Sequence, residues 1–522
     1  MSPGRPTPVR AVGGRRVDTV GGVARVVVVG AGLGGLAAAA RLAAAGHAVT
    51  VLERAAGIGG KLGRFSRDGH VFDTGPSLLT MPHVLADLFT ATGAPLEAAL
   101  ELVRLDPAVA YRFADGTGLA VPGRPREVSG AMDAALGAGA GREWTELLER
   151  AATMWRVSEQ PFLRSPLHGV RTLVRLAGRP ADVAAVAPWQ TLRGLGTRQL
   201  THPHLRTLLD RYATYSGSDP RRAPAVLATV PYVEQHFGSW YVPGGLHRLA
   251  EAVAERALRH GTTLRTGCAV RRVVLERGRA AGVELADGEI VPADLVVSGV
   301  DAAALYADLL PAGRRTHRAR RDLRRAIPSL SGFVLLLALR GRTPGLAHHT
   351  VLFPADYDAE FDAVFGTGRA GGEPRPVPDP TVYISAPDDP ALRPDEDSES
   401  WFVLVNAPRH DPGRGVDWNA PGLADRYAAT ILDVLARRGM DVRNRLRWCE
   451  VRTPADLERD TGSPGGSIYG TSSNGARAAF LRPGNVSPVP GLFLVGGSAH
   501  PGGGLPLVTL SAEIVAGLVG PA

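Results

Sequence analysis

The chain has 522 residues, of which 44% are hydrophobic and 21% charged, a composition typical of a globular protein with two or three subdomains and room for a large buried ligand. Its net charge of +8 does not indicate a nucleic-acid partner, because the arginines are spread along the chain without an aromatic RNA-binding motif or zinc-finger spacing. Cys268 and Cys449 lie far apart and no histidines or cysteines have ligand spacing, so neither a disulfide framework nor a metal site is predicted.

The first 24 residues are basic and rich in Pro and Gly. They lack the continuous apolar core of a secretory signal. We therefore expect a disordered tail at residues 1–24 and a cytoplasmic protein.

A strand, a glycine turn, a helix and a second strand follow in residues 25–53. Val26–Val29 is a β-branched run suited to a buried parallel strand, and Leu33–Ala45 is rich in helix formers. Glu53 ends the second strand at the position where a carboxylate accepts hydrogen bonds from a ribose. A membrane-spanning helix is the alternative for this apolar stretch, but its glycines and β-branched start argue against it. The pattern predicts a dinucleotide turn at Gly30, Gly32 and Gly35.

Glu53-Arg54, then Gly59-Gly60-Lys61, then Asp73-Thr74-Gly75-Pro76 continue the chain. This block resembles the second FAD signature of flavin amine oxidases, phytoene desaturases and Rab GDP-dissociation inhibitors. The resemblance implies bound FAD with Arg54, Gly60, Gly75 and Pro76 around it. Lys61, the only lysine in the chain, would place its charge near the phosphates or the flavin; the alternative is a chance solvent-exposed lysine. We expect Asp73 to orient the turn.

The stretch from Arg211 to Val253 holds an aromatic loop that ends in Gly244-Gly245. It is similar to a carotenoid desaturase segment in which this glycine pair opens a helix near the flavin. A hairpin turn that caps a surface helix is the alternative. Glu234 and His236 precede the aromatic loop and are candidate proton acceptors.

Residues 262–301 alternate β-branched side chains with turn signals, which predicts a β-meander that returns to a buried strand at Leu295–Ser298. By resemblance, Val270 packs its backbone on the adenine. Three further stretches are interpreted as strands of a second, mixed sheet: Ser329–Phe353, Asp379–Pro394 and Thr453–Gly470.

The C-terminal stretch from Pro490 to Leu518 contains a strand, Leu492–Val495, then Gly496-Gly497, then His500-Pro501-Gly502-Gly503-Gly504-Leu505-Pro506, and a helix expected to start near Val508. It closely resembles the loop of carotenoid desaturases that lies against the isoalloxazine ring. The resemblance implies flavin contacts from Gly496, Gly497, Gly504, Leu505 and Pro506. His500 is the other candidate proton acceptor, with a structural role in its own turn as the alternative.

These features predict an α/β fold with a Rossmann-like FAD-binding domain, a mixed β-sheet substrate domain and a helical membrane-associating subdomain. After the tail (1–24), we expect the FAD-binding domain to be assembled from three separate segments, 25–110, 225–300 and 451–522, the last of which holds the flavin loop and helix. The intervening segments are the substrate-domain strands (111–140), the helical membrane and substrate-entry subdomain (141–224) and the mixed sheet of the substrate domain (301–450).

The resemblance implies an FAD-dependent desaturase that removes hydrogen from a long isoprenoid hydrocarbon such as phytoene or a neurosporene-type intermediate, by hydride transfer to flavin N5. A late-pathway carotenoid oxygenase or ketolase, a desaturase of hydroxylated or methoxylated carotenoids, and a non-catalytic prenyl-binding chaperone remain alternatives. The sequence shows no second dinucleotide fingerprint, so we expect quinone or oxygen as electron acceptor.

Residues 161–199 carry several arginines and only one acid, Asp182, and a helix after Pro166 would be basic and amphipathic. Trp189 suits an interfacial depth. We therefore expect peripheral contact with an anionic membrane at its inner, cytoplasmic face. A helix packed on the protein's own core is the alternative.

Overall fold

A five-stranded parallel sheet, in the order β19-β13-β1-β2-β9, forms one half of the computed structural model, which describes residues 22–167, 179–367, 372–475, 478 and 482–522. The predicted tail lies almost entirely outside the described residues. The strands of this sheet are β1 (Arg25–Val29), β2 (Ala48–Leu52), β9 (Thr263–Arg265), β13 (Leu295–Ser298) and β19 (Leu492–Leu494).

Both faces of this sheet are covered, which explains why β1 is a continuous apolar run. One face packs on α1 (Leu33–Ala44), α2 (Pro82–Ala91), α10 (His247–Arg259) and α17 (Leu505–Val519). The other carries the meander β10 (Val270–Glu276), β11 (Arg279–Leu285) and β12 (Ile290–Pro292), with α12 (Arg314–Arg325) nearby. The predicted meander and its return strand at Leu295–Ser298 are confirmed.

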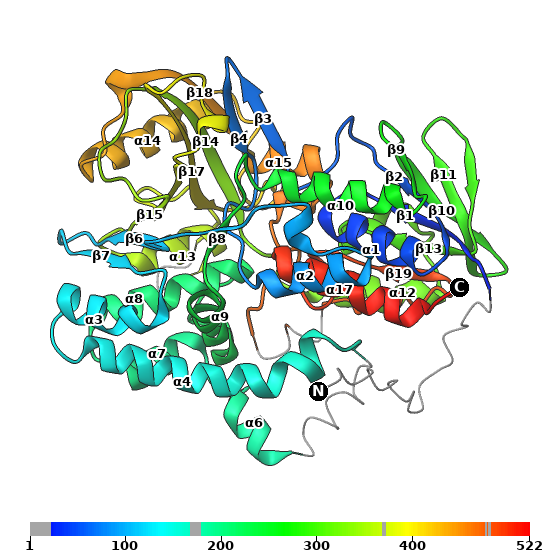
Figure 1. Ribbon diagram of the computed structural model, residues 1–522, viewed down its shortest axis with the longest axis horizontal. Coiled ribbons are helices and arrows are strands. Elements are labelled where there is room, and N and C mark those ends of the chain that lie inside the picture. The colour runs from blue at the N-terminus through cyan, green and yellow to red at the C-terminus, as the bar shows by residue number, and fades with distance from the viewer. Residues whose placement is uncertain (1–21, 168–178, 368–371, 476–477, 479–481) are drawn as a thin grey trace.

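A seven-stranded mixed sheet forms the second half, in the order β18-β14-β17-β16-β15-β6-β7 (Figure 1). Its strands are β6 (Val109–Arg112), β7 (Gly118–Val121), β14 (Ser331–Arg340), β15 (His349–Leu352), β16 (Val382–Ser385), β17 (Ser398–Ala407) and β18 (Leu446–Arg452). The helices α13 (Tyr357–Phe365) and α14 (Leu423–Arg437) cover it. A hairpin of β3 (Arg64–Arg67) and β4 (His70–Asp73) stands beside it, and β5 (Val103–Arg104) pairs with β8 (Trp240–Tyr241).

A helical lobe lies below both sheets in Figure 1. It contains α3 (Pro125–Leu136), α4 (Ala140–Ser158), α6 (Pro180–Val186), α7 (Leu192–Gln199), α8 (Pro203–Arg211) and α9 (Thr229–Phe237). Its core joins the edge of the second sheet, because Trp144 and Leu147 of α4 belong to the same buried cluster as Tyr111 of β6.

The α/β fold class with a second, mixed sheet is confirmed, whereas two local predictions are wrong. Thr453–Gly470 is not strand: Pro454–Thr461 is helix α15, since Thr453 and Asp456 form a capping box and Pro454 occupies the first turn. The C-terminal helix starts at Leu505, three residues before Val508, because a proline at the second position fits a first turn. The segment boundaries stay a prediction.

Asp73 holds the start of α10; its expected role in orienting its own turn stays a prediction. Its two carboxylate oxygens accept hydrogen bonds from the main-chain N–H groups of Leu246, at 2.7 Å, and His247, at 2.9 Å. Gly245 precedes them with a φ of 96°, which a side chain would strain. The glycine pair therefore opens a helix, and its position near the flavin stays a prediction.

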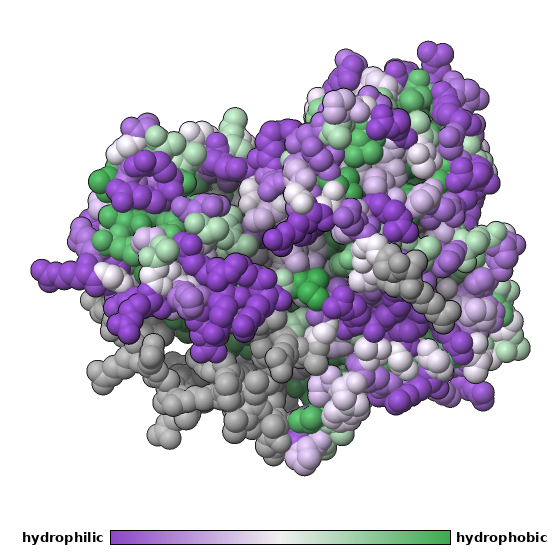
Figure 2. Space-filling model, turned by 180° about the vertical axis from the view of Figure 1, so that it is seen from behind, coloured by the Kyte–Doolittle hydropathy of each residue, from purple (hydrophilic) through white to green (hydrophobic). Residues whose placement is uncertain are grey.

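Within the described ranges, none of the helices is both long and apolar enough to cross a membrane. Figure 2 shows a face that is largely hydrophilic, with small separate hydrophobic areas. The membrane-associating role of the helical lobe stays a prediction.

Candidate functional site

A cavity of about 1320 Å³ begins at the carboxyl ends of β1, β2 and β13 and continues beneath the second sheet into the helical lobe. Open α/β sheets bind ligands at these strand ends. The volume exceeds the roughly 300 to 1,000 Å³ of a site for one drug-sized molecule. The cavity therefore has room for more than a single small ligand.

The predicted dinucleotide turn lines this cavity and depends on close main-chain contacts. Gly30 has a φ of 98°, and a Cβ on Gly35 would stand 2.1 Å from the carbonyl oxygen of Gly30. Gly32 is the N-cap of α1 and forms a bridge with Gly59, next to Gly60. No side chain caps α1, so its first amide groups are free to face an anion in the cavity.

Glu53 is 8% exposed and reaches back to the glycine turn. Its Oε2 accepts the N–H of Ala31 at 2.7 Å, and its Oε1 accepts that of Ala55 at 2.9 Å. Each oxygen keeps a lone pair for a ribose hydroxyl. Arg54 and Val270 also line the cavity; Arg54 donates to the carbonyl oxygen of Arg459 at 2.6 Å.

The side chain of Lys61 lies in the cavity wall, so the alternative of a chance solvent-exposed lysine does not hold. Its Nζ donates to the carbonyl oxygens of Ser467, at 2.8 Å, and Ile468, at 2.7 Å, and burial lowers its pKa to about 8. Gly75 must lack a side chain, because a Cβ there would lie 1.7 Å from the carbonyl oxygen of Lys61; Pro76 follows in the cavity wall.

The C-terminal glycine loop closes the opposite side of the cavity. Gly496, Gly497, Gly504, Leu505 and Pro506 all line it. Gly504 is the N-cap of α17 with a φ of 114° and no side-chain cap, so a second free helix N-terminus faces the same space. A Cβ on Gly34 of α1 would be 3.0 Å from the Cα of Gly496, so the two glycine segments are in main-chain contact.

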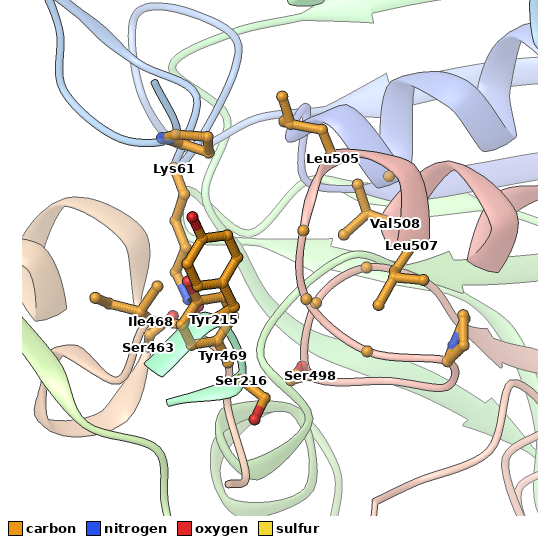
Figure 3. Close-up of a pocket in the computed structure, with 18 of the residues that line it drawn as sticks. Lys61, Tyr215, Ser216, Ser463, Ile468, Tyr469, Ser498, Leu505, Leu507 and Val508 are labelled. Carbon is orange, nitrogen blue, oxygen red and sulfur yellow. Dashed lines mark hydrogen bonds between the residues drawn. The ribbon is translucent and has the colours of Figure 1, made fainter. Parts of the chain in front are cut away.

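Tyr469 and Arg482 complete this wall, and the sequence patterns predict neither of them. Arg482 donates to the carbonyl oxygens of Tyr469, Thr471 and Gly497 at 3.1, 2.5 and 2.6 Å. A Cβ on Gly503 would lie 2.6 Å from the ring of Tyr469. Figure 3 shows Lys61 and Tyr469 on one side of the cavity and Leu505, Leu507 and Val508 on the other.

His500 lines the cavity but is held by the helical lobe. The residue is 1% exposed; its Nε2 lies 3.1 Å from the carbonyl oxygen of Ser165, and Phe162 packs edge-on at 5.1 Å between centroids. Because the partner is a carbonyl, Nε2 carries the hydrogen. Burial lowers the pKa of His500 to about 4. This geometry anchors the ring in its neutral form, the form that a proton acceptor needs.

Glu234 lies behind the cavity wall rather than in it. Its oxygens accept the hydroxyl groups of Tyr212, at 2.8 Å, and Tyr215, at 2.9 Å. Of these two tyrosines, Tyr215 lines the cavity. Contact between Glu234 and a ligand would therefore pass through Tyr215.

The site fits FAD on observations of this structure. Two uncapped helix N-termini face one cavity and suit phosphates and an electron-rich ring, and Glu53 has lone pairs left for a ribose. At Gly35 and Gly75 the main chain leaves no room for a side chain.

Known proteins similar to this chain are also flavin and carotenoid enzymes. Residues 33–354 match the family described as flavin-containing amine oxidoreductase. The chain is 33% identical to the 4,4'-diapolycopene oxygenase of Methylomonas sp. over 94% of its own length and 97% of that protein. It is 34% identical to the hydroxyneurosporene desaturase of Cereibacter sphaeroides over 94% and 96%, and 31% identical to the 4,4'-diaponeurosporene oxygenase of Staphylococcus aureus over 94% and 97%.

Solved structures share the fold at lower identity. Putrescine oxidase bound to putrescine aligns with a TM-score of 0.63 and 16% identity over 94% of this chain and 98% of that one. An oxidoreductase from Methanosarcina mazei aligns with a TM-score of 0.60 and 19% identity over 94% and 98%.

Replacing Glu53 tests the nucleotide end of the cavity. Glu53→Ala should weaken FAD binding about 10- to 150-fold, because a charge-assisted hydrogen bond contributes about 1.5 to 3 kcal/mol. Quenching of flavin fluorescence during titration of the apoprotein measures this change. Glu276→Ala, an exposed carboxylate on β10, is the control. Equal dissociation constants for the Glu53 variant and the wild type would show that Glu53 does not contribute to FAD binding.

His500 should make stability depend on pH. Below pH 6.5 the unfolded chain protonates this ring, whereas the folded chain resists protonation until about pH 4, so the free energy of unfolding falls on acidification through that window. The contribution is about 1.4 kcal/mol for each unit of pKa shift. His500→Gln should show a shallower fall in urea unfolding between these limits, while His348 and His349 contribute equally to both proteins. Identical pH profiles would contradict the buried neutral ring.

Proposed function

This chain belongs to the flavin-containing amine oxidoreductase family, and from that premise we propose that it is an FAD-dependent carotenoid desaturase that introduces C=C bonds into a long isoprenoid chain. The observation that carries the proposal is the single continuous cavity, which joins the dinucleotide turn to an apolar compartment in the second sheet. Leu330, Val334, Phe402 and Leu404 line that compartment. Such a surface suits a hydrocarbon.

Bound flavin supplies a hydride acceptor, which no side chain can provide. Desaturation removes two hydrogens from adjacent carbons, one as hydride and one as a proton. The apolar compartment would hold the chain extended and exclude water from the reacting carbons. His500 and Glu234 stay the proposed proton acceptors, of which His500 lines the cavity and Glu234 would act through Tyr215. We propose quinone or oxygen as the final electron acceptor.

An oxygenase is the second candidate, because two of the relatives carry that name. The two reactions differ in whether oxygen is found in the product. A prenyl-binding chaperone is disfavoured, since every glycine of the predicted flavin signature lines the cavity and the chain belongs to an oxidoreductase family.

Product analysis separates these functions. Cells that accumulate phytoene, neurosporene or lycopene, with or without a terminal hydroxyl, would express the chain, and extracted carotenoids would be analysed by absorbance and mass. A desaturase gives products two hydrogens lighter with red-shifted absorbance. Products that have gained oxygen favour the oxygenase, and unchanged substrates in cells that contain the flavin-loaded protein would contradict both.

We also propose peripheral membrane contact through the helical lobe beside α6. Val183 and Val186 of α6 line the cavity, and other residues of this helix are exposed, so we place the opening of the cavity beside α6. Trp189 follows with 70% of its surface exposed, and Arg179 is also exposed. Residues 168–178 of the basic helix expected from the sequence lie outside the described residues. An exposed indole and a cation beside an apolar opening suit a lipid interface.

Replacing Trp189 tests this contact. Trp189→Ser should reduce co-sedimentation with vesicles that contain phosphatidylglycerol several-fold, because an interfacial aromatic side chain is lost. Leu258→Ser is the matched control, since Leu258 is exposed on α10, away from the opening. Equal binding of both variants would place the membrane contact elsewhere.

A further inference from the structure

Arg211, the last residue of α8, is a buried cation that faces the cavity. It is 8% exposed and lines the cavity wall. Its Nη1 donates to the hydroxyl oxygens of Tyr215, at 2.9 Å, and Tyr111, at 3.4 Å. In the part of the chain that the structure describes, Nε and Nη2 of Arg211 make no hydrogen bond and no carboxylate lies within ion-pair distance.

Glu234 is the nearby anion, and tyrosines keep it away from Arg211. Tyr215 donates its hydroxyl to Glu234 and presents its oxygen to Arg211, while Tyr212 satisfies the other carboxylate oxygen. A buried guanidinium is usually paired directly with a carboxylate. Here the intervening phenol holds the guanidinium in place, and the rings of Tyr111, Tyr212 and Tyr215 lie 5.1 to 6.0 Å from it. Nε and Nη2 are left without an oxygen partner among the described residues.

Tyr215, which binds Arg211, lies on the side of the cavity where Tyr469 meets the C-terminal glycine loop (Figure 3). Burial raises the pKa of Tyr469 to about 12, and the positive charge of Arg211 opposes that rise. Tyr469 packs on Gly503 of the glycine loop. Tyr215 lies with Lys61 and Tyr469 on the same side of the cavity in Figure 3.

A pure hydrocarbon in this position would remove water from the free N–H groups of Arg211 and offer no acceptor, which is unfavourable. An oxygen atom on the substrate would accept them. We propose that Arg211, positioned by Tyr215 and Glu234, forms an oxygen-binding subsite, so that the preferred substrate is an isoprenoid chain with a hydroxyl or aldehyde oxygen at the end that enters beside the glycine loop. This proposal rests on the proposed function and specifies its substrate.

Paired substrates test the subsite. Three polyenes of equal length, one with a hydrocarbon end, one with a terminal hydroxyl and one with a terminal aldehyde, would be compared by kcat/KM and by the shift in polyene absorbance on binding. We expect the wild type to prefer an oxygenated chain by about 10-fold or more. The two oxygenated substrates distinguish hydroxyl from aldehyde recognition.

Three variants test which residues cause the preference for an oxygenated substrate. Arg211→Met and Tyr215→Phe should bring the ratio between oxygenated and hydrocarbon substrates close to one, both in binding and in turnover. Tyr212→Phe is the matched control and should keep the wild-type ratio, since Tyr212 also bonds Glu234 but does not line the cavity. Flavin content and thermal unfolding establish that each variant is folded, and Tyr215→Phe decides the matter if Arg211→Met does not fold.

The outcomes are distinguishable. A wild-type ratio near one, or a ratio that persists in the folded Arg211 or Tyr215 variant, overturns the subsite and leaves the desaturase. A flavin-loaded wild type that neither binds nor converts any of the three polyenes overturns the proposed function itself.

Discussion

Two partly buried cations, Lys61 and Arg482, bind main-chain carbonyl oxygens of residues 467–471. Lys61, which follows Gly59 and Gly60, donates hydrogen bonds to the carbonyl oxygens of Ser467 and Ile468. Arg482 binds those of Tyr469, Thr471 and, on the C-terminal loop, Gly497. Carbonyl acceptors compensate the loss of hydration that lowers the pKa of both cations, to about 8 for Lys61 and about 10 for Arg482. These bonds tie three distant parts of the chain into one cavity wall, and they place the ring of Tyr469 on the glycine loop.

Much of the nucleotide end could be predicted because its constraints are local. The strand, the glycine turn and the helix follow one another within residues 25–45, so a short stretch of sequence predicts all three. Residue 35 must be glycine because a Cβ there would collide with the carbonyl oxygen of Gly30, only five residues earlier. The meander at residues 270–292 follows equally from alternation and turn signals. The strand prediction for Thr453–Gly470 is wrong because the capping box at Thr453 sets a helix there, and that signal outweighs the aromatic and β-branched residues of the stretch.

The rest of the site depends on contacts that sequence spacing does not reveal. Arg482 is close in sequence to Tyr469 and Thr471, but nothing in that spacing shows that it also donates to the carbonyl oxygen of Gly497. Glu234 stands out in the sequence as an acid near an aromatic loop, yet only the fold shows that Tyr215 separates it from the cavity. Arg211 is one arginine among many in an arginine-rich chain. Its burial in the cavity wall, with a phenol between it and the nearest carboxylate, is visible only in three dimensions.

One cavity that brings a flavin and a long isoprenoid chain into reacting contact is the arrangement on which the proposed chemistry depends. Anaerobic mixing of the flavin-loaded protein with substrate in detergent or vesicles tests it most directly, since flavin absorbance falls when the ring accepts hydride. We expect bleaching in proportion to the double bonds formed and recovery of the absorbance when quinone or oxygen is added. A flavin that stays oxidised while substrate is bound, or product that forms without any change in flavin absorbance, would contradict this arrangement.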